Sequence, residues 1–443
     1  MANHLHLNRA RLPQGWADNV RLTVEGGVIT AIETGVPQGD AERIAGAVVP
    51  AVTNLHSHAF QRAMAGLAER AKAGVEDFWA WREAMYRFLD RITPEQMEAI
   101  AAMLYAELAE GGYSGIVEFH YLHNDPTGQA YADPAETAHA HRRAAEAAGF
   151  GLTLAPVLYS HSSFGGLPPK PGQRRFIKTT DQFLRLLELS KAEAFAFHSL
   201  RAVTPEQIRD VLAAVDPVLP IHIHAAEQTG EVDDCLAWSG ARPVEWLLAN
   251  APMSSRWTLV HATHMTDAEA SGLARAGSTV ALCPSTEGNL GDGFFNADAF
   301  LGAGGRFGIG SDSHVTTNVA EELRWFEYGR RLQLRKRTLS GGTGEHVGAG
   351  LWLSAARAGA NPTGLKTGEI AVGARCDLVV LDESHPTLVE RPGDLILDSL
   401  VFSGSGGIDQ VWSGGRRIVE GGRHIAREAI AARYRQAVRE LSE

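Results

Sequence analysis

Eight short apolar runs, separated by stretches with helical periodicity, constrain the fold of this chain more than any other feature. The runs lie at residues 48–55, 115–119, 152–158, 194–197, 220–223, 258–260, 279–282 and 307–309. Helical patterns stand between most of them, as at residues 94–110, 134–148 and 205–214. Strands that alternate with helices indicate a parallel sheet. Eight such units predict an α/β fold, a closed (β/α)₈ barrel of the TIM type.

The two ends of the chain have a different, β-rich texture. Residues 20–24 and 28–32 are alternating runs joined by Glu25-Gly26-Gly27, which is typical of a hairpin. Near the other end, residues 377–382 read as a strand and residues 411–419 as strand, turn and strand. We therefore expect both termini to build one small β-sandwich domain, residues 1–50 with 366–443, which includes a C-terminal helix. Residues 51–365 are left for the barrel.

Composition limits the partners and the cellular location that we expect for the protein. The formal net charge of the 443 residues is -11, which is unlike the basic footprint of a nucleic-acid-binding protein. Three widely spaced cysteines without a C-x-x-C pair argue against a disulfide framework and fit a reducing compartment. The first residues lack the apolar core of a signal peptide, and no run is long and apolar enough to span a membrane. We expect a cytoplasmic protein that binds neither nucleic acid nor membrane.

Histidines follow the first and the fifth predicted barrel strand, at the end where such barrels carry their chemistry. In His56-Ser57-His58 the two imidazoles stand two residues apart in an extended segment and so project to the same side. An isolated H-x-H is more often a pair of surface histidines, but a second one, His222-Ile223-His224, follows strand five. We favour His224 as a metal ligand because Glu227 follows it as a nearby proton carrier, and we expect His222 to fill the barrel interior.

Two more polar residues complete this predicted rim. His261 follows strand six, and Asp312 follows the glycines at the end of strand eight. A lone aspartate in such a turn is usually a helix cap, but its coincidence with the histidines favours a metal site. Imidazoles and a carboxylate suit zinc, although iron or manganese could serve. Zinc lowers the pKa of a bound water from about 15.7 to about 7, and Asp312 and Glu227 could act as the base and the acid of a hydrolysis.

This set of residues resembles the amidohydrolase superfamily, and so do the terminal sandwich and residues 368–381. The two-metal members carry a carboxylated lysine at the end of strand four, whereas residues 194–201 contain no lysine. The chain is therefore similar to the one-metal deaminase branch. The resemblance implies that one divalent ion, by default zinc, is bound by His56, His58, His224 and Asp312. It also implies that Glu227 and Asp312 carry protons and that His261 orients the attacking water.

Longer runs are similar to one group within this superfamily, the N-formimino-L-glutamate deiminases of histidine degradation. These runs are residues 54–67 (NLHSHAFQRAMAGL), 79–82 (WAWR) and 198–201 (HSLR). The resemblance implies hydrolysis of this small dicarboxylate to N-formyl-L-glutamate and ammonia, and a homodimer. It assigns substrate binding to Gln61, Arg82, Tyr121, His198 and Arg201. Arginine suits the carboxylates because it offers bidentate donors. Without the resemblance, Arg82 could equally lie on a solvated helix face, and Tyr121 could be a core aromatic residue.

Two other functions remain open at this point. Trp79, Trp81 and Phe60 could stack on a ring, so the chain could be a deaminase of a purine or another aminoheterocycle. It could also be a scaffold that kept the barrel and lost catalysis, although the complete polar set argues against this. The zinc deaminases of nucleic-acid bases are excluded because their P-C-x-x-C motif is missing. Residues 283–290 should line the mouth of the barrel, without individual roles.

Overall fold

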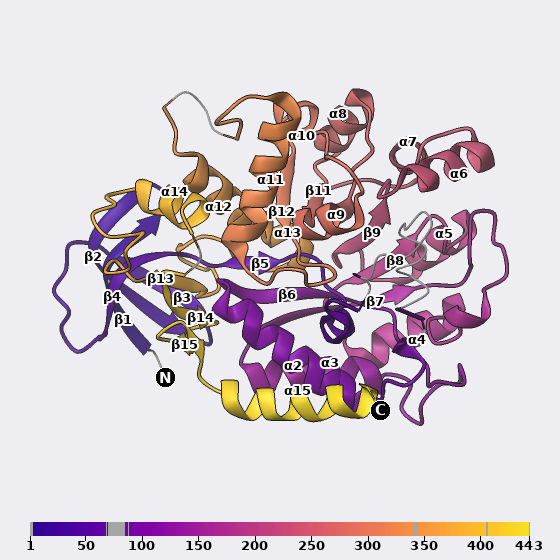
Figure 1. Ribbon diagram of the computed structural model, residues 1–443, viewed down its shortest axis with the longest axis horizontal. Coiled ribbons are helices and arrows are strands. Elements are labelled where there is room, and N and C mark those ends of the chain that lie inside the picture. Colours follow the sequence, from indigo (N-terminus) through magenta and orange to yellow (C-terminus); the bar gives the residue numbers. More distant parts are fainter. Residues whose placement is uncertain are drawn as a thin grey trace.

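The computed structural model describes residues 3–67, 69, 85–86, 88–340, 344–404 and 406–442. Its centre is an eight-stranded parallel barrel in which each strand pairs with its neighbour along the chain (Figure 1). The strands are β5 (Val52–Asn54), β6 (Tyr113–His120), β7 (Gly151–Leu158), β8 (Phe195–Ser199), β9 (Ile221–Ala225), β10 (Trp257–His261), β11 (Thr279–Leu282) and β12 (Arg306–Ile309). The ring is closed where the amide of Leu55 donates to the carbonyl of Ile309 at 2.9 Å and Ser57 forms a parallel bridge with Asp312. The predicted (β/α)₈ barrel is confirmed.

Helices follow the barrel strands and begin at residues that the sequence marks. They are α2 (Pro94–Glu110), α3 (Glu136–Ala148), α4 (Thr180–Ser190), α5 (Pro205–Ala214), α6 (Thr229–Ser239), α7 (Pro243–Asn250), α8 (Asp267–Ala276), α9 (Pro284–Leu290), α10 (Ala297–Gly302), α11 (Val319–Leu334), α12 (Val347–Ala358) and α13 (Ala360–Thr363), with short 3₁₀ turns at Ala59–Met64 and Pro171–Gln173. Thr93, Thr179, Thr204 and Thr266 each cap a helix, and a Gln or Glu three residues on closes the capping box. Each box satisfies amide groups that the first helical turn leaves unpaired.

The first predicted strand, residues 48–55, is wrong as one element. Residues up to Pro50 belong to β4 (Glu42–Pro50) of the terminal sheet, and only β5 lies in the barrel. The chain passes from one sheet to the other at Ala51, whose amide donates to the carbonyl of Asp377 at 3.1 Å. The apolar run is continuous because residues on both sides of this crossing are buried.

The two termini share a second eight-stranded sheet, as the sequence predicted. Its order is β16-β15-β14-β13-β4-β1-β2-β3, so β4 from the N-terminal part pairs with β13 from the C-terminal part. The other strands are β1 (Asn3–Leu12), β2 (Gly15–Glu25), β3 (Val28–Glu33), β13 (Leu378–Leu381), β14 (Ile408–Ser413), β15 (Arg416–Glu420) and β16 (Arg423–His424). Val48 and Val380 face a core of this domain, while Val49 and Val379 face the barrel. This alternation joins the two units; their limits at residues 50 and 366 stay a prediction.

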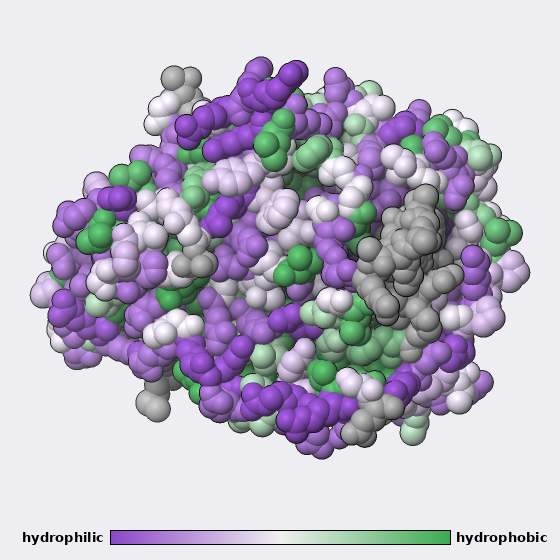
Figure 2. Space-filling model, viewed as in Figure 1, coloured by the Kyte–Doolittle hydropathy of each residue, from purple (hydrophilic) through white to green (hydrophobic). Residues whose placement is uncertain are grey.

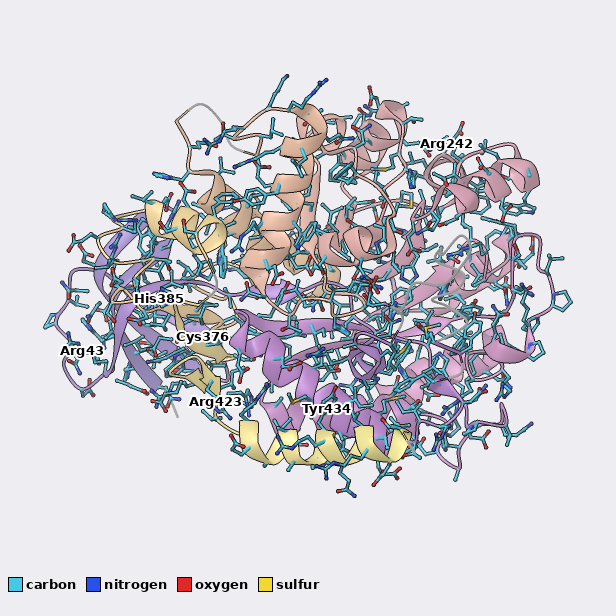
Figure 3. All side chains as sticks on the ribbon, in the orientation of Figure 1. Arg43, Arg242, Cys376, His385, Arg423 and Tyr434 are labelled. Carbon is cyan, nitrogen blue, oxygen red and sulfur yellow. The ribbon has the colours of Figure 1, made fainter. Side chains whose placement is uncertain are left out.

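The C-terminal helix α15 (Arg427–Ser442) runs along α2 at the lower edge of the molecule, and α14 (Leu395–Phe402) lies near α12 (Figure 1). Tyr434 of α15 packs against the core (Figure 3), and the outer side of this helix is hydrophilic (Figure 2). Cys235, Cys283 and Cys376 are buried free thiols. Among the described residues, no helix has both the length and the apolar character needed to cross a membrane.

Candidate active site

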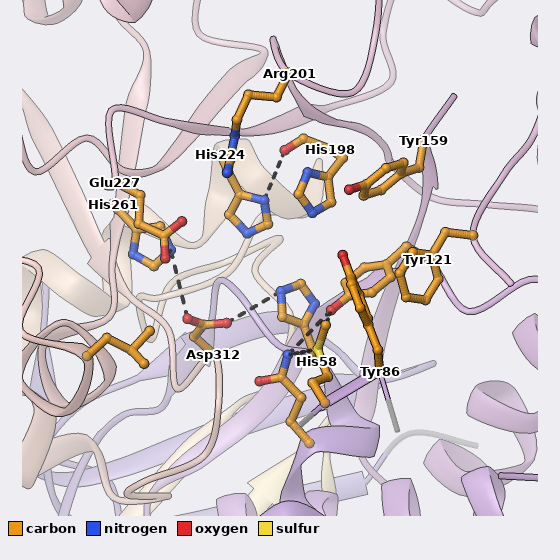
Figure 4. A pocket seen from close by; sticks show the side chains of 14 residues that line it. His58, Tyr86, Tyr121, Tyr159, His198, Arg201, His224, Glu227, His261 and Asp312 are labelled. Atoms are coloured by element: carbon orange, nitrogen blue, oxygen red, sulfur yellow. Dashed lines mark hydrogen bonds and ion pairs between the residues drawn. The ribbon is translucent and has the colours of Figure 1, made fainter. Parts of the chain in front are cut away.

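Three imidazoles and one carboxylate, from three barrel strands, converge at the carboxyl ends of the strands. Figure 4 shows His58, His224 and Asp312 of this group. The Nε2 atom of His56 lies 3.2 Å from Nε2 of His58 and 3.1 Å from Nε2 of His224. Oδ1 of Asp312 lies 3.4 Å from Nε2 of both His56 and His58. The structure thus brings together all four residues that the resemblance assigned to the metal.

Backbone carbonyls hold two of these imidazoles in one orientation. Nδ1 of His58 lies 3.0 Å from the carbonyl of Phe119, and Nδ1 of His224 lies 2.9 Å from the carbonyl of His198. A carbonyl only accepts, so each Nδ1 donates its proton and each Nε2 is left with a lone pair. Such outer hydrogen bonds are usual for metal-binding histidines.

The electrostatics of the cluster fit a divalent cation. Burial lowers the pKa of His56 to about 3 and lowers the pKa values of His58 and His224, so the three rings are neutral. Burial alone would raise the pKa of Asp312, but the hydrogen bond from His56 and the nearby histidines hold it below its usual value. Nitrogen lone pairs that face one another at about 3 Å, beside an ionised carboxylate, are matched by a bound cation.

A second group, centred on His261, adjoins the cluster. Nε2 of His261 lies 3.8 Å from Oε1 of Glu227 and 3.8 Å from Oδ2 of Asp312, and its Nδ1 lies 3.2 Å from Oε1 of Glu287. Burial opposes protonation of His261, but the three carboxylates outweigh it and raise its pKa to about 10. Burial also raises the pKa of Glu227, against the nearby charges of His261 and Arg201. A carboxyl group whose pKa is raised in this way is suited to carry a proton in acid–base catalysis.

The backbone is strained where these side chains leave the strands. Ala226, His261 and Asp312 have φ values of 53°, 66° and 44°, in the left-handed region that non-glycine residues rarely adopt. Such strain costs of the order of 1–3 kcal/mol per residue and concentrates at functional sites. Here the left-handed residues stand at the ends of β9 and β10 and three residues after the end of β12.

The predicted substrate residues that the structure describes line the same cavity. Gln61, Tyr121, His198 and Arg201 share it with His58, His224, Glu227, His261 and Asp312. The guanidinium of Arg201 is buried and forms no salt bridge within the described part of the chain, and its Nε atom has no hydrogen-bond partner there. Burial opposes its charge, but the nearby carboxylates of Glu231 and Glu227 outweigh this and raise the pKa of Arg201. Nε2 of Gln61 donates to the hydroxyl of Tyr121 at 3.4 Å. The predicted Arg82 lies outside the described residues, as do Trp79 and Trp81.

His222 does not join this cavity, in agreement with its predicted place in the barrel interior. Its Nε2 lies 2.9 Å from the carbonyl of Pro362, and the side chain is fully buried.

Several residues of the cavity were missed from the sequence. Met85, Tyr86, Tyr159 and Phe176 also line it, with Tyr86, Tyr121 and Tyr159 opposite Glu227 and Asp312 (Figure 4). Leu290 lines it too, from the segment 283–290 that was predicted to lie at the mouth. Tyr159 directly follows β7, so the rule that selected the other strand-end residues could have found it. Glu287 lies in the segment predicted to line the mouth, but no pattern marked its contact with His261. Tyr86 and Phe176 come from connections that periodicity does not place.

Comparisons with known proteins agree with this geometry. Residues 47–418 match the model of the Amidohydrolase family, and residues 3–45 match that of the N-terminal domain of formimidoylglutamate deiminase HutF. A formimidoylglutamate deiminase of Pseudomonas aeruginosa is 51% identical over 98% of both chains. An 8-oxoguanine deaminase of the same organism is 28% identical over 89% of this chain and 87% of its own.

Solved structures give the same result at the level of the fold. A crystal structure of an amidohydrolase from Brucella melitensis is 45% identical, covers 100% of both chains and has a TM-score of 0.95. An adenosine deaminase from Xanthomonas campestris with bound zinc is 21% identical, covers 99% of this chain and 98% of its own, and has a TM-score of 0.79, a likeness of fold alone. By family match and whole-length identity, the chain belongs to the amidohydrolase family and, within it, to the formimidoylglutamate deiminases.

Proposed function

We propose that this protein hydrolyses N-formimino-L-glutamate to N-formyl-L-glutamate and ammonia, a step of histidine degradation. The observation that carries the proposal is a single cavity that joins the histidine cluster to Arg201, a buried cation that forms no direct salt bridge with the described residues. A substrate carboxylate would satisfy this guanidinium. The cationic formimino group would then lie toward Glu227 and Asp312, whose carboxylates have the opposite charge.

One divalent ion, zinc by default, is part of the proposal. His56, His58, His224 and Asp312 would hold it, because their donor atoms converge and the three rings are neutral. The chemistry that such an ion supplies is a water made acidic enough to act as a nucleophile at neutral pH.

The side chains of the cavity account for the proton transfers. Water adds to the formimino carbon, and the bond from this carbon to its terminal nitrogen then breaks. Asp312 accepts a proton from the water, and Glu227, whose pKa is raised by burial, passes a proton to the departing nitrogen. His261 is held by Glu287 and faces Glu227, so it orients these groups and stabilises the charge that develops beside them.

The test is to incubate the metal-loaded protein with N-formimino-L-glutamate and to measure ammonia and N-formyl-L-glutamate. Equimolar formation of both products is expected, and activity on aminopurines with none on this substrate would contradict the proposal. Arg201→Met should raise KM for the dicarboxylate at least tenfold, since it removes a charge-assisted hydrogen bond worth about 1.5–3 kcal/mol. Arg201→Lys keeps the charge without the bidentate geometry, so its KM should lie between those of the parent and of Arg201→Met.

A cytoplasmic location and a homodimer also belong to this proposal. Both come from the similarity to the deiminases. Light scattering during size-exclusion chromatography tests the homodimer, for which a single species of twice the chain mass is expected.

A further inference from the structure

We infer that Glu118, a buried carboxylate outside the cavity, positions the His56–Ser57–His58 segment so that both imidazoles face one point. This inference rests on the proposed metal site. The two oxygens of Glu118 take hydrogen bonds from the residues on either side of His58: Oγ of Ser57 donates to Oε2 at 2.9 Å, and the amide of Ala59 donates to Oε1 at 2.8 Å. One carboxyl group thus fixes the backbone directly before and directly after a candidate ligand.

Side chains alternate between the two sides of an extended backbone, which explains why Glu118 contacts this segment on the side that faces away from the cluster. His56 and His58 project toward the cluster, so Ser57 between them projects to the other side. On β6, Phe119 likewise faces the cluster, with its ring centroid 4.9 Å from that of His56 and 4.5 Å from that of His224, and Glu118 faces away from it. Ser57 and Glu118 therefore meet on the hidden side of the segment that carries the histidines.

The neighbouring residue Phe119 completes the attachment. Its amide donates to the carbonyl of Ser57 at 3.0 Å, and its carbonyl accepts from Nδ1 of His58 at 3.0 Å. Residues 118 and 119 together make four hydrogen bonds to residues 57–59. Movement of Glu118 would therefore shift both the backbone around His58 and the carbonyl that sets the orientation of its ring.

Within the described part of the chain, no lysine or arginine forms an ion pair with Glu118. The side chain is 1% exposed, and burial raises its pKa to about 8. On its far side the hydroxyl of Tyr105 donates to Oε2 at 3.4 Å, and Nε2 of His141 lies 3.9 Å from Oε1. Burial lowers the pKa of His141 to about 3, so this ring is neutral. A buried carboxyl group without a cation is costly to fold, and its hydrogen bonds are concentrated on the ligand segment.

The positioning role can be separated from a general packing role by two substitutions. Glu118→Gln keeps an oxygen for the amide of Ala59 and an amide group that can donate to Oγ of Ser57. Glu118→Met has a similar volume and removes both hydrogen bonds. Loss of an outer hydrogen bond at a metal site typically costs about 10- to 100-fold in metal affinity or activity.

We would load each variant with cobalt(II), record its visible spectrum and cobalt dissociation constant, and measure kcat and KM. For Glu118→Met we expect a changed spectrum, cobalt affinity weakened at least tenfold, and a lower kcat with KM changed less than threefold. Glu118→Gln should recover most of the affinity and the parent spectrum. Glu327→Met is the control for loss of a buried carboxylate: Glu327 is equally buried, accepts from the amide of Leu339 and pairs with Arg330 and Arg331, outside the histidine cluster. It should lower thermal stability and leave the spectrum unchanged.

A parent spectrum and kcat in folded Glu118→Met would overturn the inference, and so would a Glu118→Gln variant as impaired as Glu118→Met. If Glu118→Met does not fold, Ser57→Ala removes one of the two bonds alone. Ser57→Ala should change the cobalt spectrum less than Glu118→Met is expected to. An unchanged spectrum in Ser57→Ala would equally overturn the inference. Failure of the parent protein to bind cobalt or to release ammonia would instead contradict the proposed function.

Discussion

At the scale of single residues, the site works through side chains whose protonation is set by their neighbours. Carbonyls of Phe119 and His198 leave the Nε2 lone pairs of His58 and His224 free, and carboxylates keep His261 protonated. Glu227 faces this imidazole from 3.8 Å but lies outside the four converging donors. In the proposed function, proton transfer and metal binding therefore fall to different residues, except at Asp312.

Replacing Glu227 by Gln should separate these two tasks. The amide cannot carry a proton, so we expect kcat to fall by about 10²- to 10⁴-fold, the usual contribution of a general acid or base. Metal content should stay at the parent value, because the four donors remain. Ammonia release and elemental analysis of the same sample measure both. Glu327→Gln controls for the loss of a buried carboxylate, and loss of metal from Glu227→Gln would refute this division of roles.

At the scale of elements, the ends of neighbouring strands are packed so closely that small residues are required. A Cβ atom at Gly310, just after β12, would stand 2.8 Å from Cβ and 2.9 Å from the amide nitrogen of His56. The end of β12 therefore fixes the place where His56 leaves β5. Close contact between these two strands is also what closes the barrel.

Gly310→Ala should accordingly disturb both stability and the metal site. We expect the free energy of unfolding to fall by about 1–3 kcal/mol, as for other overpacked positions, and metal affinity to weaken because His56 must move. Denaturant unfolding and a competition assay for the metal give the two numbers. Gly302→Ala is the control, since a Cβ there meets no atom within 4 Å. Equal behaviour of the two variants would show that the contact at Gly310 does not matter.

The junction of α9 and α11 makes stability depend on pH. Glu322 of α11 is fully buried and accepts from the amide of Ser285 at 2.9 Å and from its hydroxyl at 2.6 Å; burial raises the pKa of Glu322 to about 8. Between about pH 4.5 and pH 8 the folded protein therefore binds a proton that the unfolded chain has released. The resulting stabilisation is complete below about pH 4.5 and is lost as the pH rises through about 8.

Glu322→Gln removes this titration. The free energy of unfolding of the parent, relative to that of Glu322→Gln, should decrease steadily from pH 5 to pH 8. Urea unfolding at fixed pH values measures it. A constant difference, or one that grows with pH, would contradict the assigned protonation.

Some elements of this fold could be predicted from the sequence and others could not. The barrel, the terminal sheet and the strand-end polar residues follow from local patterns: period, capping threonines and residues just after apolar runs. Residues 48–55 were read as one strand because both sheets bury their residues, so hydrophobicity did not mark the crossing at Ala51. Tyr86 and Phe176 reach the cavity from connections whose course depends on tertiary packing. The contact of Glu287 in α9 with His261 depends on tertiary packing in the same way. Glu118 read as part of a buried strand, and only the fold shows that its side chain meets Ser57.

At the scale of the whole molecule, the terminal sheet and α15 surround one side of the barrel but contribute none of the described residues that line the cavity. The alternation of Val48 with Val49 and of Val379 with Val380 lets the same strands build the core of the small domain and cover the barrel. We therefore interpret the small domain as a support for β5, which it joins at Ala51. The histidines of the site begin only five residues after that crossing.

The most direct test of the account is a metal titration of the whole protein. Chelator-treated protein, titrated with zinc while ammonia release from N-formimino-L-glutamate is followed, should start inactive and gain activity linearly up to one equivalent per chain. His224→Asn should show no such gain, since it removes one of four converging donors. Full activity in the metal-free protein, or a break at two equivalents, would contradict the claim that one ion held by His56, His58, His224 and Asp312 supports the hydrolysis.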